Sequence, residues 1–181
     1  MDVQDAACPA PWSLRSAELG GEPVERAAGI EALARAWKAE RYIAALDPDE
    51  RKRLGGYLDF LRVGADRELI RQNEHGDFMV VVLEGKVAVA RDQPSGPRVR
   101  LAEVHAGDVV GDMAMLDSGA RSSYCTTLTP CLLAVVDAAM LEALIEREPR
   151  LGLAVMAALS RRLSLRLRQV STRLSALLAG R

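Results

Sequence analysis

The stretch from residue 107 to residue 123, GDVVGDMAMLDSGARSS, combines glycines, a short apolar run and a single arginine. Residues 113–116 follow Gly111 and predict one turn of helix, whose first backbone N–H groups have no partner within the helix. Such groups favour a bound anion, and Arg121 can close on the same anion with a forked, charge-assisted hydrogen bond. Ser122 adds a hydroxyl donor. The spacing is compatible with a phosphate cradle and also with an ordinary surface turn.

Short β-type runs surround this stretch on both sides. Glycine- and proline-containing turns separate them, and closely spaced short strands are typical of an antiparallel barrel or jelly roll. We therefore expect a β-roll over residues 63–137. The runs are 68–71, 78–83, 86–91, 98–104, 124–129 and 131–136.

Before the roll, the sequence predicts a loose leader and then helices. Residues 1–22 are rich in Ala, Pro, Gly and Ser and show little periodicity. Residues 23–62 are expected to be helical, with a break before Asp47. Asp47 is a favourable N-cap residue and Pro48 suits the first helical position, so a second helix should run from there to about Leu61.

After the roll, residues 138–181 predict a short helix and then a long one from about residue 150 to residue 178. The predicted fold class is mainly β: an antiparallel β-roll, jelly-roll-like, with N-terminal helices and a long C-terminal helix. The long helix carries apolar residues at a/d spacing, which favours a homodimer interface over packing on its own barrel. The stripe consists of Met156, Leu163, Leu167, Val170, Leu174 and Leu177, with Ser160 as a polar member.

Composition argues against several other classes of partner. The formal net charge is −1 and only 4% of the residues are aromatic, which disfavours nucleic-acid binding. The arginines beside the apolar stripe could contact nucleic acid or a membrane, but a solvated flank is more common. Cys8, Cys125 and Cys131 are scattered, as expected for a reducing compartment without a metal site. The N-terminus lacks the pattern of a signal peptide and no run is long enough to span a bilayer, so we expect a cytoplasmic protein without membrane contact.

The sequence does not favour catalysis. His75 and His105 have no nucleophile in a recognisable arrangement with them, and an axial haem ligand is a remote alternative for these residues or Cys125. Asp108 and Asp112 could act as paired carboxylates, but a turn-capping role is more common. We therefore expect a protein that is not an enzyme.

The segment GDMAMLDSGARSS resembles the phosphate-binding cassette of cyclic nucleotide-binding domains, as found in bacterial catabolite-activator-type regulators and in the regulatory domains of cyclic-nucleotide-dependent kinases and channels. The family pattern is a Gly-Glu pair, a short apolar helix, and then Arg followed by a small residue. Gly111, residues 113–116, Arg121 and Ser122 match it. The resemblance extends over about residues 46–170.

The resemblance implies a β-roll that binds a cyclic nucleotide, cAMP or cGMP, without a metal. The phosphate would lie on the amides of Met113 and Ala114 and on the side chains of Arg121 and Ser122. Asp112 would hold the ribose 2′-hydroxyl. The long helix would close over the base. The implied site comprises Gly111, Asp112, Met113, Ala114, Arg121, Ser122 and Ser123.

This sequence departs from the family pattern at three places. Asp112 replaces the usual Glu and is one methylene shorter, and Ser123 replaces a usual Ala. Where adenine-contacting relatives carry small hydroxyl residues on the long helix, this chain has residues 165–167, Leu-Arg-Leu. Arg166 could reach a base edge or a second phosphate.

Two functional hypotheses follow from the resemblance. The first is a sensor that binds a cyclic nucleotide and signals through its C-terminal helix to an unknown protein partner. The alternative is a degenerate module for protein interaction, in which Asp112 and Arg121 pair with each other in a filled pocket. The given sequence ends at Arg181, just after the long helix, so we expect no direct DNA binding of the kind that a helix-turn-helix provides.

Overall fold

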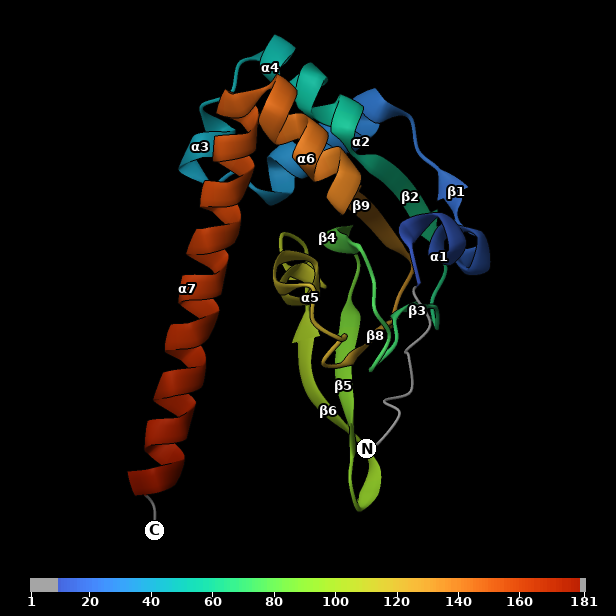
Figure 1. Cartoon of the computed structure of the whole chain (residues 1–181), viewed down its shortest axis with the longest axis vertical. Helices are drawn as coiled ribbons and strands as arrows, with labels where there is room; N and C mark the ends of the chain where they lie inside the picture. The colour runs from blue at the N-terminus through green and yellow to red at the C-terminus, as the bar shows by residue number, and fades with distance from the viewer. Residues whose placement is uncertain (1–9, 180–181) are drawn as a thin grey trace, which may run out of the picture.

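The computed structural model describes residues 10–179, and it consists of two antiparallel sheets flanked by helices (Figure 1). This arrangement confirms the predicted fold class. The larger sheet has the strand order β1 (Glu22–Pro23), β2 (Asp59–Val63), β9 (Cys131–Asp137), β4 (Phe78–Glu84) and β7 (Val109–Val110). The smaller sheet has the order β3 (Glu68–Ile70), β8 (Tyr124–Thr127), β5 (Val87–Gln93) and β6 (Gly96–Val104).

The central strands β4 and β9 are buried on both faces, which explains their uninterrupted apolar sequences. Alternate residues of a strand point to opposite faces of its sheet. In β4, Val80 and Val82 belong to the core inside the roll, whereas Met79 and Val81 belong to the core beneath the helices. The larger sheet therefore separates two hydrophobic cores.

Helices cover the outer face of the larger sheet, where α2 (Arg26–Ala36), α4 (Pro48–Leu54) and α6 (Ala138–Arg147) lie together (Figure 1). The helix α3 (Arg41–Ala44) contacts α7 (Pro149–Ala179). Asp47 caps α4 as expected: its carboxylate accepts from the Glu50 amide at 2.7 Å, and the Glu50 carboxylate accepts from the Asp47 amide at 3.0 Å.

Two expectations for the N-terminal part are wrong. Within the region expected to be a loose leader, residues 12–19 form the helix α1, because Trp12 and Leu19 are buried in the core of the roll. The residues before residue 10 lie outside the described part of the chain. The helix expected to reach Leu61 ends at Leu54, followed by a turn of 3₁₀ helix η1 (Gly55–Tyr57), and β2 begins at Asp59. Pairing of β2 with β9 along its whole length overrides the helical spacing of its apolar residues.

The long helix α7 packs on its own domain only in its first part. Leu151, Val155 and Leu159 are buried, and the apolar residues beyond them become exposed. Met156 of the predicted stripe packs against the chain's own helical core, so a single chain already covers part of this residue. Leu163 is half-buried, and the remaining members of the stripe, Leu167, Val170, Leu174 and Leu177, are 55–72% exposed. The C-terminal half of α7 extends alongside the roll (Figure 1).

Between residues 10 and 179, no helix combines the length and apolarity needed to cross a membrane. The same residues contain no group of three or more His, Cys, Asp or Glu side chains arranged to hold a metal ion.

Candidate functional site

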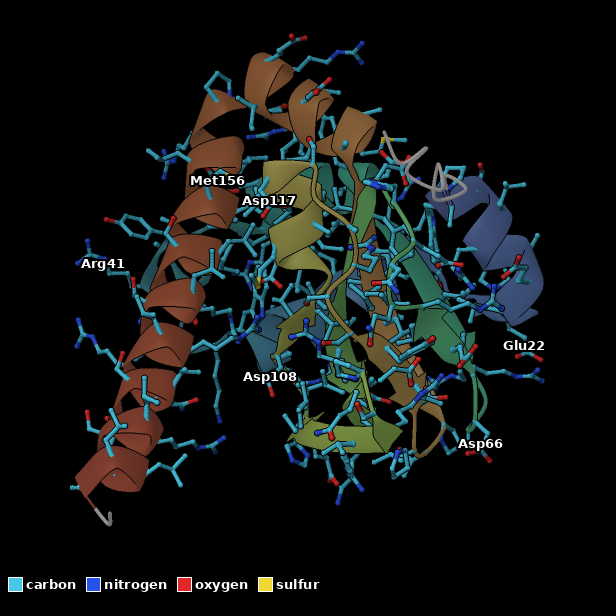
Figure 2. All side chains as sticks on the ribbon, turned by 60° about the horizontal axis from the view of Figure 1, so that its bottom comes forward. Glu22, Arg41, Asp66, Asp108, Asp117 and Met156 are labelled. Carbon is cyan, nitrogen blue, oxygen red and sulfur yellow. The ribbon has the colours of Figure 1, made fainter. Side chains whose placement is uncertain are left out.

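A cavity of about 580 Å³ lies between the roll and α7, a volume within the usual range for a small-molecule site. Its walls come from the segment 107–123, from β5 and β6, and from one face of α7. Figure 2 labels Asp108 and Asp117, which lie on the side of the roll that faces α7. All the site residues expected from the sequence line this cavity: Gly111, Asp112, Met113, Ala114, Arg121, Ser122 and Ser123.

Arg121 is the buried cation of the cavity wall, with an exposed fraction of 3%. Its Nη1 donates to the carbonyl oxygen of Gly111 at 2.7 Å and its Nη2 to the carbonyl oxygen of Phe78 at 2.6 Å. Desolvation lowers the pKa of Arg121 from its ordinary value, but an arginine in a protein stays charged. Among the described residues, no carboxylate forms an ion pair with Arg121. The cavity therefore offers a fixed positive charge that an anion can neutralise.

Gly111 places Arg121 beside the short helix α5 (Asp112–Asp117). Its φ of +81° is the left-handed conformation, which glycine adopts without strain. A Cβ atom at this position would lie 2.6 Å from Nη1 of Arg121 and 2.8 Å from Cδ1 of Ile70. A glycine is thus required both for the turn into α5 and for the close approach of the guanidinium.

Asp112 is buried at the start of α5 and pairs with Arg166 of α7, not with Arg121. The Nη1 atom of Arg166 lies 3.3 Å and 3.4 Å from the two carboxylate oxygens of Asp112. The Nη2 atom of Arg166 donates to the carbonyl oxygen of Val109 at 2.8 Å. The Asp112–Arg121 pairing expected of a degenerate cassette is therefore absent, and the carboxylate implied for ribose binding is tied to α7.

A second set of contacts joins α7 to the N-terminal helices and to the start of the segment 107–123. The buried carboxylate of Glu40 pairs with Arg161 at 3.0 Å and with Arg162 at 3.1 Å. The Arg162 guanidinium lies 5.1 Å from the ring centroid of Trp37, whose Nε1 donates to the carbonyl oxygen of Gly107 at 2.9 Å. Burial lowers the pKa of Arg162. Both arginine contacts of α7, at residues 162 and 166, thus converge on the segment that carries Arg121.

The remaining cassette side chains differ in exposure. Met113 is 53% exposed and Ala114 is buried, while Ser122 is exposed and Ser123 is half-buried. Cys125 also lines the cavity, and burial raises the pKa of its thiol to about 12. A thiol with so high a pKa is a poor nucleophile at neutral pH. The wall is thus suited to holding a ligand through charge and hydrogen bonds.

Sequence reasoning missed three contributors: the Phe78 carbonyl, the Val109 carbonyl and Arg162. The first two are backbone groups, which a residue pattern does not distinguish. If residues 109–110 had been recognised as a strand paired with β4, both carbonyl groups would have been expected near the cavity. In that pairing Val80 lies opposite Val110. From the sequence, Arg166 could reach a base edge or a second phosphate; in the structure it contacts the Asp112 carboxylate.

The chain is similar to known proteins in both sequence and fold. Residues 60–148 match the family model of the cyclic nucleotide-binding domain. A solved cyclic nucleotide-binding domain from Methylobacillus flagellatus aligns with a TM-score of 0.78 and 25% identity, over 86% of this chain and 87% of its own. The Thermus thermophilus catabolite activator protein aligns with a TM-score of 0.62 and 26% identity, over 75% of this chain and 62% of its own.

Curated relatives match over a shorter stretch. The cAMP-activated global transcriptional regulator CRP of Haemophilus influenzae is 30% identical over 118 residues, which is 65% of this chain and 53% of the relative. The CRP-like cAMP-activated global transcriptional regulator of Mycobacterium tuberculosis is 29% identical over 92 residues, 51% of this chain and 41% of the relative. The matched regions thus span about half the length of these relatives or less. Through residues 60–148, the chain belongs to the cyclic nucleotide-binding domain family.

Proposed function

We propose that the cavity binds a cyclic nucleoside monophosphate, cAMP or cGMP, and that the protein is a sensor without catalytic activity. The observation that carries this proposal is Arg121, a buried cation at the cavity wall without a carboxylate partner among the described residues. A buried cation without a carboxylate partner is costly even when carbonyl oxygens accept its hydrogen bonds, and an anionic ligand offsets that cost. A phosphodiester with a single negative charge fits this requirement.

We propose a position in the cavity for each part of the ligand. The phosphate would lie between Arg121, Ser122, Ser123 and the amides at the start of α5. The ribose would follow toward Asp112, and the base would lie between β5–β6 and α7. Apolar side chains on both sides of that last region would cover the base: Val89, Leu101, Leu165 and Val170.

Signalling would pass through α7. A ribose hydroxyl that binds Asp112 competes with Arg166 for the same carboxylate, so ligand binding changes what holds α7 over the cavity. Such a change shifts the population between two packings of the helix. Val170 lines the cavity and also belongs to the predicted dimer stripe. We propose that ligand binding and homodimer packing are coupled at this residue. A protein partner in the cytoplasm would then bind α7 differently in its two positions.

A second candidate function is protein interaction without a nucleotide. One observation favours it: Arg166 already provides a cation for Asp112, which is shorter than the glutamate usual in the family. In this case α7 would remain fixed, and Asp112 would serve as an anchor for the helix.

Isothermal titration calorimetry distinguishes the two functions. We expect saturable heat with cAMP or cGMP at one ligand per chain, and much weaker binding of 5′-AMP, whose dianionic phosphate monoester lacks the ring geometry. Absence of heat with both cyclic nucleotides at ligand concentrations well above micromolar would reject the sensor function and favour the interaction module.

A further inference from the structure

The helix α1 holds the loop between β3 and β4 from the side of the roll opposite α7 (Figure 1). The Ala10 amide donates to the His75 carbonyl oxygen at 2.7 Å. The Trp12 amide donates to Oδ1 of Asp77 at 2.9 Å. Arg15 forms an ion pair with Glu74. Residues 10–15, which include the start of this helix, therefore contact the loop at residues 74, 75 and 77.

The same loop holds Arg121 from its other side. The Arg121 amide donates to the Glu74 carbonyl oxygen at 2.8 Å, and the Asn73 amide donates to the Arg121 carbonyl oxygen at 2.8 Å. A Cβ atom at Gly76 would lie 2.6 Å from Nη2 of Arg121. Because the guanidinium lies so close to the loop backbone, any displacement of the loop displaces the guanidinium.

Arg15 provides the first connection between α1 and the guanidinium. Its side chain is 1% exposed, and it pairs with Glu74 and, at 2.8 Å, with Glu18. An arginine buried to this extent is strongly fixed, since its charge must keep its partners. Glu74 in turn accepts the Arg121 amide through its carbonyl oxygen. The buried ion pair thus fixes the residue to which the Arg121 backbone is bonded.

Trp12 provides the second connection. Its ring centroid lies 5.2 Å from that of Phe78, and its Nε1 donates to Oδ2 of Asp59 at 2.7 Å. The Arg121 guanidinium lies 4.7 Å from the same Phe78 ring and donates to the Phe78 carbonyl oxygen. Phe78 therefore contacts both Trp12 and the anion-binding cation.

We propose that Trp12 and Arg15 are positioning residues for the anion site: they act through Glu74 and Phe78 to hold the Arg121 guanidinium at the cavity wall. Neither residue lines the cavity. The proposal rests on the function proposed above for its effect on nucleotide affinity, but the position of Arg121 can be tested without a nucleotide.

The first test compares two arginines that contact the same carboxylate. Arg15→Met removes the buried partner of Glu74, whereas Arg71→Met removes a 41% exposed partner 3.6 Å from Glu74. We expect Arg15→Met to weaken cAMP affinity about tenfold, because residues in one charged network are strongly coupled. Arg71→Met should change the affinity by less than about twofold, as for an exposed ion pair. Arg15→Lys should recover part of the loss.

A merely structural role makes a different prediction. Calorimetry is done at a temperature at which thermal unfolding curves show that every variant is folded. If Arg15 only stabilises the fold, its replacement then leaves the dissociation constant for cAMP unchanged. If Arg15→Met does not fold, Glu74→Gln tests the same contact from its partly exposed side and should weaken affinity in the same way. Unchanged affinity in the folded variant would overturn the positioning role.

The second test uses the ligand-free protein. In protein labelled with ¹⁵N-arginine, the Nε–H signal of Arg121 is assigned by its loss in Arg121→Lys. We expect Arg15→Met and Trp12→Leu to shift this signal, and Arg71→Met to leave it in place. If wild-type protein binds no cyclic nucleotide, the proposed function fails, and this signal alone decides on positioning. An Arg121 signal that does not move in either α1 variant would contradict the inference.

Discussion

The Asp112 carboxylate and the Arg166 guanidinium lie 3.3 Å apart and join the first residue of α5 to the middle of α7. The side chain of Asp112 is 4% exposed, whereas that of Arg166 is 41% exposed. The pair therefore connects a buried anion of the cavity wall to a cation at its edge. The family resemblance implies the same carboxylate in ribose binding, so we expect this ion pair to couple occupancy of the cavity to the position of the helix.

Arg166→Met should destabilise the ligand-free protein by about 1–2 kcal/mol, because it leaves the buried Asp112 carboxylate without its cation. The partial exposure of Arg166 limits the loss, since water screens the pair. Urea unfolding measures the loss. Combined with Asp112→Asn, the cost should be smaller than the sum of the two single costs. Arg173→Met is the matched control, because Arg173 lines the same cavity but forms no ion pair within the described residues. Additive costs would contradict a direct interaction.

Gly111→Ala should weaken both folding and nucleotide binding. The alanine must adopt a φ of +81°. Its Cβ would lie 2.6 Å from Nη1 of Arg121, so the guanidinium would have to move away. Backbone strain of this kind costs on the order of 1–3 kcal/mol. Gly56→Ala is the control, since a Cβ there meets nothing within 4 Å. Equal thermal stability of the two variants would show that Gly111 carries no special constraint.

The dimer stripe is tested by two leucines of α7 with the same exposure. Leu153 and Leu167 are both 67% exposed, but only Leu167 belongs to the stripe. We expect wild-type protein and Leu153→Glu to sediment as dimers and Leu167→Glu to sediment as a monomer, because a charge in an a/d seam is unfavourable. A monomeric wild-type protein would leave the exposed stripe without this role.

Cys125 should resist thiol reagents in the folded protein. Burial raises its pKa from 9.0 to about 12, and burial also raises the pKa of Cys131. In a Cys8→Ser background at pH 8, we expect slow reaction of the native protein and fast reaction in guanidinium chloride. The unfolded chain releases its thiol protons at a lower pH than the folded chain, so this contribution to stability falls as the pH rises from about 9 toward 12. Rapid labelling of the native protein would contradict the burial of these thiols.

The sequence predicts the roll and the composition of the cassette because both depend on local patterns. Alternating apolar runs, turn residues and the order of Gly111, the short helix and Arg121 are readable along the chain. In the structure every site residue expected from these patterns lines one cavity, although ligand binding by these residues stays a prediction.

The sequence does not predict what joins distant segments. The helix α1 lies in a leader of turn-forming composition, and tertiary burial of Trp12, Arg15 and Leu19 explains why it forms. The Asp112–Arg166 pair depends on how α7 crosses the roll, which residue spacing does not determine. The residues from Asp59 onward fit a helix by spacing, and pairing with β9 makes them a strand.

The most direct test of the central claim is the ratio of cAMP affinities of wild-type protein and Arg121→Ala by titration calorimetry. Removing the guanidinium leaves the phosphate without its buried cation, so we expect a loss of about 100-fold or more. Arg147→Ala, on the exposed face of α6, is the control and should bind as wild type does. Wild-type binding that survives Arg121→Ala undiminished would contradict the account.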